Sequence, residues 1–168
     1  MATHQFLTFT LAGEQYAVDV AQVREVLAEL ELTRIPRMPE YLKGVINIRG
    51  SVVPVVDLRT KFGLPETEKT VDTSVIVMDV ESAGGTITVG CLADSVQEVV
   101  DISVDDVEET PTLGTSIDAR FIQGLGKKDE RFIIMLDMDY VFHAEDLTVV
   151  GAASKAAEPQ AAAAKAAK

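Results

Sequence analysis

The chain contains few side chains of the kinds that carry out chemistry. Among its 168 residues it has one cysteine, Cys91, and two histidines, His4 and His143. A nucleophilic site needs a serine or cysteine in reach of a base, and a structural zinc site needs several Cys or His ligands. Cys91 lies in the apolar run VGCLA, which favours a buried small residue, and both histidines are expected on the surface. We therefore predict no catalytic residue, no metal site, no cofactor and no internal disulfide.

Acidic residues are abundant, but no pair of them stands out as an acid and base. The cluster Asp101, Asp105, Asp106, Glu108 and Glu109 lacks the alternating ligands and central glycine of a calcium loop, so a solvated acidic loop is the better interpretation. The sequence also lacks a phosphate-binding glycine loop and a serine flanked by glycines. A small acid/base enzyme is kept only as a remote alternative.

The charge balance excludes two classes of partner. The chain has 15 Lys and Arg against 27 Asp and Glu, for a formal net charge of -12. Nucleic acids and anionic membranes bind clustered cations, which this sequence does not supply. It also has no uncharged apolar run near the roughly 20 residues of a membrane span. We expect a cytoplasmic protein that binds no nucleic acid and does not insert into a membrane.

The segment most indicative of a function is KGVINIRGSVVPVVDL, from Lys43 to Leu58. Two apolar runs flank Arg49-Gly50, which predicts a hairpin with an arginine near its tip. Such an arginine suits a carboxylate-bearing partner, although a solvated hairpin charge fits the spacing equally well. Pro54 cannot donate a ladder hydrogen bond, so its strand is expected at a sheet edge or with a bulge.

The elements around this segment are mainly β. Short runs rich in Val, Ile and Phe alternate with turns at Ala12-Gly13, Arg49-Gly50, Gly84-Gly85 and Gly126-Lys127. The predicted strands are 6–11, 15–18, 44–48, 52–57, 74–81, 86–93, 99–104 and 131–137. An apolar stripe from Val20 to Leu30, with Asp19 as N-cap, predicts a helix, and a second helix is expected over 138–147.

The sequence also repeats itself. Four landmarks recur in the same order at offsets of 73, 75, 80 and 80, and they include Gly44 with Gly124 and Asp57 with Asp137. We predict two similar β subdomains in tandem, roughly 5–65 and 70–145, that pack on each other because each is too small to be stable alone. The Ala/Lys-rich segment 149–168 cannot bury a core and is expected to be a flexible tail.

These motifs are similar to those of the CheW family of bacterial chemotaxis coupling proteins. The residues that carry the resemblance are 5–9, 16–20, 23–26, 34–36, 41–50 and 53–59, together with Gly124 and the strand ending at Asp137. The resemblance covers about 4–148. It implies two five-stranded, SH3-like β-barrels packed side by side, with one or two short helices, and no catalytic activity.

The resemblance also implies partners and a site. Family members join the cytoplasmic tip of a chemoreceptor to the regulatory domain of the histidine kinase CheA, and they are recruited through receptors to the inner face of the membrane. The receptor-binding positions carried over are Val23, Glu25, Gly44, Val45, Arg49 and Gly50. We expect a monomer when free. The alternative is another CheW-like regulatory or interaction domain of a two-component pathway.

Overall fold

The computed structural model describes residues 3–28, 32–34, 36, 39–65, 70–82, 85–103, 107–108, 121–128 and 131–142. Within these residues the fold is mainly β, as predicted, with eleven strands and three short helical segments. The expected tail, His143 and the acidic residues Asp105, Asp106 and Glu109 lie outside the described residues. His4 is exposed and Cys91 is buried, as expected.

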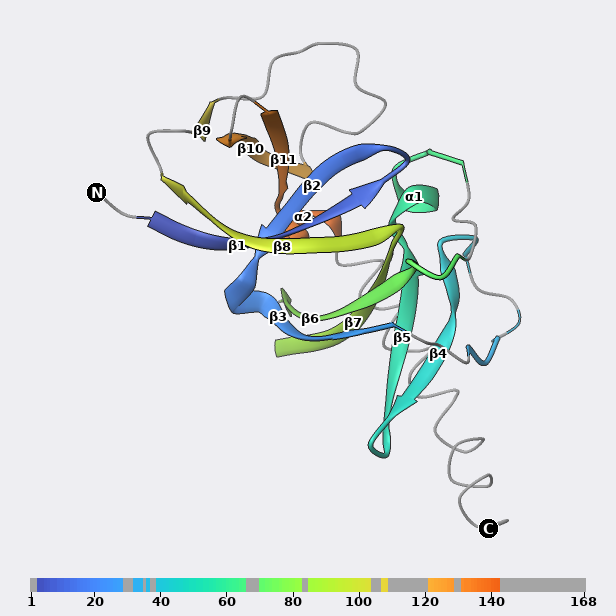
Figure 1. Ribbon diagram of the computed structural model, residues 1–168. Helices are drawn as coiled ribbons and strands as arrows, with labels where there is room; N and C mark the ends of the chain where they lie inside the picture. Colours follow the sequence, from blue (N-terminus) through green and yellow to red (C-terminus); the bar gives the residue numbers. More distant parts are fainter. Residues whose placement is uncertain are drawn as a thin grey trace.

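The strands form two sheets (Figure 1). Sheet A has the order β8 (Ser95–Ser103), β1 (Thr3–Leu11), β2 (Glu14–Asp19), β11 (Arg131–Leu136), β10 (Ile122–Lys128) and β9 (Val107–Glu108). Sheet B has the order β3 (Val23–Leu27), β6 (Ser74–Ser82), β7 (Gly85–Ala93), β5 (Ser51–Asp57) and β4 (Leu42–Ile48). Each sheet contains one parallel pair, β2 with β11 and β5 with β7.

Both sheets curl so that their outer strands approach each other. After β3 at one edge of sheet B, the chain returns at Thr33 to form a bridge with Val45 of β4 at the other edge. In sheet A, β9 follows β8 closely in sequence and pairs with β10 at the opposite edge. The chain after one edge strand therefore closes each sheet, which accounts for the barrel-like units that the resemblance implies.

The internal repeat is present in the structure. Gly44 and Gly124 stand at register shifts in the equivalent hairpins β4–β5 and β10–β11. Asp57 donates its backbone N–H to the carbonyl of Tyr41 at 2.7 Å, and Asp137 donates to Phe121 at 2.9 Å, each pair 80 residues from its counterpart. The matched landmarks lie in like elements, except for the pair Pro36 and Pro111 at the offset of 75, because Pro111 falls outside the described residues.

The two repeats do not form one sheet each, and here the tandem boundaries 5–65 and 70–145 need correction. Hairpin β1–β2 belongs to the first repeat but pairs with β8 and β11 of the second. Hairpin β6–β7 belongs to the second repeat but pairs with β3 and β5 of the first. The repeats have thus exchanged their N-terminal hairpins, and each sheet is built from both halves of the chain.

Three apolar clusters follow from this arrangement. Ile133 and Met135 belong to a cluster on one face of sheet A, and Val53 and Val55, 80 residues earlier, belong to its counterpart in sheet B. The alternate side chains of both sheets meet in a larger shared core, which includes Phe9 and Tyr16 from sheet A with Met78 and Cys91 from sheet B. Interior strands such as β5 and β7 therefore have buried side chains on both faces, whereas edge strand β3 alternates between half-buried and exposed positions.

The predicted helix from Val20 to Leu30 is wrong. Asp19 does act as an N-cap, accepting from the backbone N–H of Ala21, but the helix it begins is the 3₁₀ turn η1 (Val20–Gln22). Strand β3 follows and pairs with β6. The second predicted helix is present as α2 (Met138–Val141), and residues 143–147 lie outside the described residues.

Two other expectations are also corrected. Gly126 and Lys127 lie inside strand β10 rather than in a turn; a Cβ on Gly126 would lie 3.0 Å from the Cδ1 of Ile102 and 3.1 Å from the Sδ of Met135, so this glycine serves close packing. Pro54 stands in an interior strand, between β4 and β7. It is tolerated because the pairing of β5 with β7 begins only at Val55.

Candidate functional site

Four of the six predicted site residues lie on strands of sheet B, and the other two lie in the turn of its hairpin β4–β5. Val23 and Glu25 are on edge strand β3; Gly44 and Val45 are on β4, and Arg49 and Gly50 form the turn between β4 and β5. This hairpin projects beyond the rest of sheet B (Figure 1). The structure brings Glu25 and Arg49 into direct contact, which their separation of 24 residues does not predict.

Arg49 is held in an unfavourable backbone conformation. Arg49 has φ 49° and Gly50 has φ 88°, so both residues of this two-residue turn are left-handed. Glycine or asparagine normally fills such positions, because a Cβ is strained there. The turn is fixed by the backbone N–H of Gly50, which donates to Oδ1 of Asn47 at 2.9 Å. Arginine therefore occupies a position that its backbone preference disfavours.

The Arg49 side chain is aligned by Glu25. Its Nη2 donates to Oε1 at 2.9 Å and its Nη1 to Oε2 at 3.3 Å, a two-pronged pair. The guanidinium side chain is 78% exposed, whereas Glu25 is 25% exposed. Two of the five guanidinium N–H donors are used in this pair, so the arginine is oriented and still faces solvent.

A second polar group lies beside Glu25. Arg24 pairs with Asp79 at 3.7 Å and donates to the hydroxyl of Thr88 at 3.3 Å, and Thr88 donates to Asp79 at 2.7 Å. These side chains cross three neighbouring strands, β3, β6 and β7. The surface at the edge of sheet B therefore presents two arginines, each matched to a carboxylate.

The other three predicted positions have structural roles. Gly44 has φ 151°, and a Cβ there would come within 2.5 Å of the carbonyl oxygen of Thr33. Val45 is buried, and its N–H and C=O both bond to Thr33 at 2.9 Å. Val23 is half-buried and packs against the shared core. These residues shape the closed edge of sheet B and offer little surface of their own.

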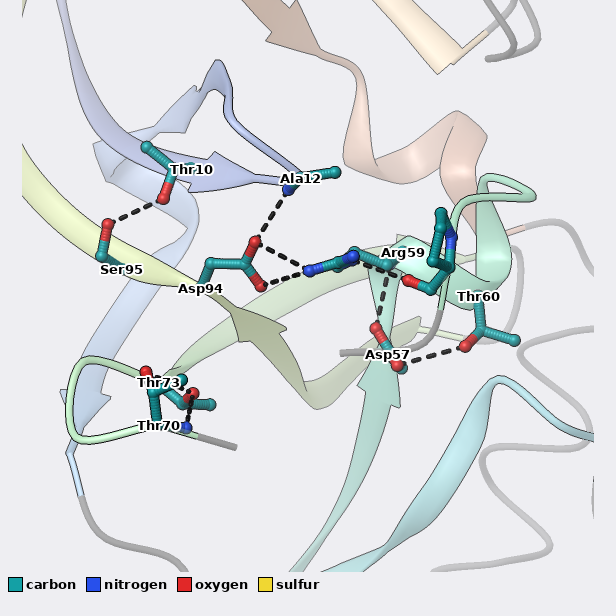
Figure 2. A network of polar contacts seen from close by, with 10 residues as sticks. Thr10, Ala12, Asp57, Arg59, Thr60, Thr70, Thr73, Asp94 and Ser95 are labelled. Carbon is teal, nitrogen blue, oxygen red and sulfur yellow. Dashed lines mark hydrogen bonds and ion pairs between the residues drawn. The ribbon is translucent and has the colours of Figure 1, made fainter. Parts of the chain in front are cut away.

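Sequence reasoning missed a partly buried polar network where the two sheets meet (Figure 2). Arg59, in helix α1 (Leu58–Lys61), pairs with Asp94 at 3.0 Å, and Asp94 accepts from the backbone N–H of Ala12 at 2.7 Å. The same helix begins with Asp57, whose carboxylate accepts from the N–H of Arg59 and the hydroxyl of Thr60. Asp57 thus caps α1.

Within the described part of the chain, no three His, Cys, Asp or Glu side chains gather as a metal ion would require. None of the helices in that part is long and apolar enough to cross a membrane. The thiol of Cys91 is buried, and desolvation raises its pKa to about 12, so it is a poor nucleophile at neutral pH.

Comparison with known proteins gives consistent matches over most of the chain. The sequence model of the CheW-like domain matches residues 5–146. The chain is 32% identical to chemotaxis protein CheW of Klebsiella aerogenes, covering 90% of this chain and 89% of that protein. It is also 32% identical to CheW of Bacillus subtilis, over 84% and 88%. Among solved structures, the scaffolding protein TtCheW from Thermoanaerobacter tengcongensis matches with a TM-score of 0.75 and 32% identity, covering 87% and 92%.

Proposed function

The chain belongs to the CheW-like domain family of chemotaxis scaffold proteins, and on that premise we propose that it is a non-catalytic adaptor joining a chemoreceptor to the kinase CheA. One partner is the cytoplasmic tip of the receptor and the other is the regulatory domain of CheA. The free protein is a monomer in the cytoplasm, and it reaches the inner face of the membrane through the receptor.

The observation that carries this proposal is the pair of Arg49 and Glu25. An arginine at φ 49°, 78% exposed and held by a two-pronged contact, is a preorganised recognition group. An exposed ion pair contributes little to stability, about 0 to 1 kcal/mol, so stability does not explain a strained arginine at this turn.

The pair modifies how Arg49 would recognise a partner. Its fork toward a carboxylate is occupied by Glu25, so the two side chains act as one dipolar unit at the edge of sheet B. A receptor surface that offers both an acceptor and a donor would complement this unit. Val23 lies two residues before Glu25 on β3, Gly50 follows Arg49 in the turn, and Gly44 and Val45 lie on β4, which leads into the turn.

Titration tests this proposal. Isotope-labelled protein is titrated with a receptor cytoplasmic fragment and, separately, with a CheA regulatory domain; we expect both to bind. Arg49→Ala keeps a Cβ at the same strained φ, so stability should change by no more than about 0.5 kcal/mol. Affinity for the receptor fragment should fall about tenfold or more, since arginines at interface centres typically contribute on the order of 2 kcal/mol.

Two further variants sharpen the test. Arg49→Lys should not restore receptor affinity, because lysine cannot hold the two-pronged contact with Glu25. Arg131→Ala removes an exposed arginine from sheet A and serves as the matched control, with wild-type receptor affinity expected. Wild-type affinity in Arg49→Ala would remove this residue from the site, and binding of neither partner by the unmodified protein would refute the adaptor function.

A further inference from the structure

The network around Arg59 joins the two sheets. Arg59 lies in α1 at the end of β5 in sheet B, and Asp94 lies in the link from β7 of sheet B to β8 of sheet A. The carboxylate of Asp94 accepts from Arg59 at 3.0 and 3.3 Å and from the N–H of Ala12, in the β1–β2 turn of sheet A, at 2.7 Å. Arg59 is anchored further by its Nε, which donates to the carbonyl of Pro65 at 2.7 Å. We call these contacts the first clamp.

A second clamp joins the sheets elsewhere. Asp139 lies in α2 after β11 of sheet A, and its Oδ1 accepts from the backbone N–H of Glu81, near the end of β6 in sheet B, at 3.0 Å. The same oxygen accepts from Nε2 of Gln22 at 3.2 Å. Gln22 lies in η1, the link from β2 of sheet A to β3 of sheet B. The second clamp therefore joins a helix, a link between the two sheets and a hairpin, as the first clamp does.

The two clamps are equivalent by the internal repeat. Arg59 and Asp139 are 80 residues apart, the same offset as Asp57 and Asp137. Val75 of β6 pairs with Leu27 in β3, and Phe6 of β1 pairs with Val100 in β8, so Val75 and Phe6 occupy equivalent positions. Glu81 lies six residues after Val75, and Ala12 lies six residues after Phe6, so these two residues are equivalent as well. Both hairpins thus donate the same backbone N–H to a carboxylate. The carboxylate comes from the link in the first clamp and from the helix in the second.

We propose that the two clamps are positioning devices that fix the angle between sheets A and B, and that the first clamp restricts this angle more than the second. Its ion pair is largely shielded from solvent, with side chains 16% and 25% exposed, whereas the second clamp joins a carboxylate only to neutral donors. Hydrogen bonds between charged groups are stronger than those from neutral donors, and here Nη1 of Arg59 contacts both oxygens of Asp94. A partner that touches both sheets would then bind a surface preset by residues outside the contact area. This last step rests on the proposed function, but the fixed angle does not.

The test measures the distance between the sheets in the full chain. Spin labels are placed by Ser51→Cys in sheet B and Asp101→Cys in sheet A, both at exposed positions. The native Cys91 is fully buried and stays unlabelled. We expect Asp94→Ala to broaden the distribution of label distances measured by pulsed electron resonance. Arg24→Gln is the matched control, because it breaks an ion pair that lies within sheet B.

The outcomes separate the proposal from its alternatives. A distribution in Asp94→Ala as narrow as that of the control overturns the fixed-angle role. If Asp94→Ala does not fold, Asp94→Asn decides in the same way, since it keeps one oxygen for the Ala12 N–H but loses the charge and the second oxygen that Arg59 contacts. Asp139→Ala should broaden the distribution less than the first-clamp variant, and equal or greater broadening overturns the dominance of the first clamp.

Binding gives a second readout. If the competent angle falls to about a tenth of the population, the affinity of a partner that spans both sheets falls about tenfold. We expect such a loss in Asp94→Ala, at a temperature where a thermal melt shows it fully folded, for the receptor fragment or the CheA regulatory domain. Unchanged affinity for both would overturn the link to partner binding. Failure of the unmodified protein to bind either would refute the proposed function and leave the distance measurement as the test of the clamps.

Discussion

At the scale of single residues, the shared core controls two titrating groups. Cys91 and Tyr16 both lie in this core, on β7 and β2. Burial raises the pKa of the Cys91 thiol to about 12, and burial together with the nearby Glu14 carboxylate raises the pKa of Tyr16 to about 12. Both groups are therefore neutral in the folded protein well into alkaline solution.

The raised pKa of Cys91 predicts a loss of stability at high pH. The unfolded chain releases the thiol proton near pH 9 and the folded chain keeps it up to about pH 12, so the folded state binds more protons between these values. Stability falls as pH rises through this window, by up to about 1.4 kcal/mol per pH unit for this group. The contribution is fully present below about pH 9.

Cys91→Ala isolates this effect. The variant has a lower unfolding free energy at neutral pH because of the cavity it leaves. Between about pH 8 and about pH 10, however, its unfolding free energy should fall by about 1 kcal/mol less than that of the unmodified protein. Urea denaturation at the two pH values measures the difference, and Tyr16 and the lysines cancel in the comparison. Equal losses in the two proteins would contradict the burial of a neutral thiol.

At the scale of elements, the closed edge of sheet B depends on Gly44. Its φ of 151° and the carbonyl of Thr33, 2.5 Å from where a Cβ would stand, leave no room for a side chain. The backbone of Thr33 cannot move without breaking its two bonds to Val45. A substitution at Gly44 therefore disturbs the edge on which the proposed receptor site is built.

Gly44→Ala should consequently destabilise the protein by about 1 to 3 kcal/mol, as strained backbone positions do. Gly63→Ala is the control, since it has φ 77° but nothing within 4 Å of its Cβ position, so it carries the strain without the clash. Thermal melts of both variants separate these contributions. If Gly44→Ala melts at as high a temperature as Gly63→Ala, the backbone at Thr33 accommodates the added Cβ without a cost in stability. Any loss of receptor binding by Gly44→Ala would then arise from a change at the site and not from destabilisation of the fold.

Most elements could be predicted from the sequence because alternation and turn residues are local signals. The segment after Asp19 could not, since valines at 20, 23 and 26 have the spacing of a helical stripe and not the alternation of a strand. Pairing with β6 decides for the strand, and β-branched residues favour it. The sequence predicts a turn at Gly126 because the packing against Ile102 and Met135 that requires a glycine there comes from distant strands.

The candidate site was predictable only in part, for the same reason. The hairpin of Arg49 has a local signature, and the strand structure of its neighbours follows from alternation. The contact of Arg49 with Glu25 depends on closure of sheet B, and Asp94 and Asp139 act only once the hairpins have been exchanged between repeats. The offset of 80 residues that links Arg59 with Asp139 was the one available signal for the clamps.

At the scale of the whole molecule, the exchange of hairpins ties the two halves together. Sheet A needs strands from residues 3–19 and 95–136, and sheet B needs the stretch between them. The shared core is lined by both sheets, so unfolding either one exposes it. We expect one cooperative unfolding transition, although the sequence divides into two similar repeats.

Matched substitutions in the two separate clusters test this cooperativity. Ile46→Val removes one methylene from the cluster of sheet B, and Ile133→Val does so from the cluster of sheet A. Each should lower the free energy of unfolding by about 0.5 to 1.5 kcal/mol. Because the slowest amides exchange through global unfolding, each variant should speed exchange at the most protected amides of both sheets by the same factor, as hydrogen exchange with mass spectrometry can measure. Each variant is the control for the other. Faster exchange confined to the substituted sheet would mean that the sheets open independently, and the hairpin exchange would then not couple them.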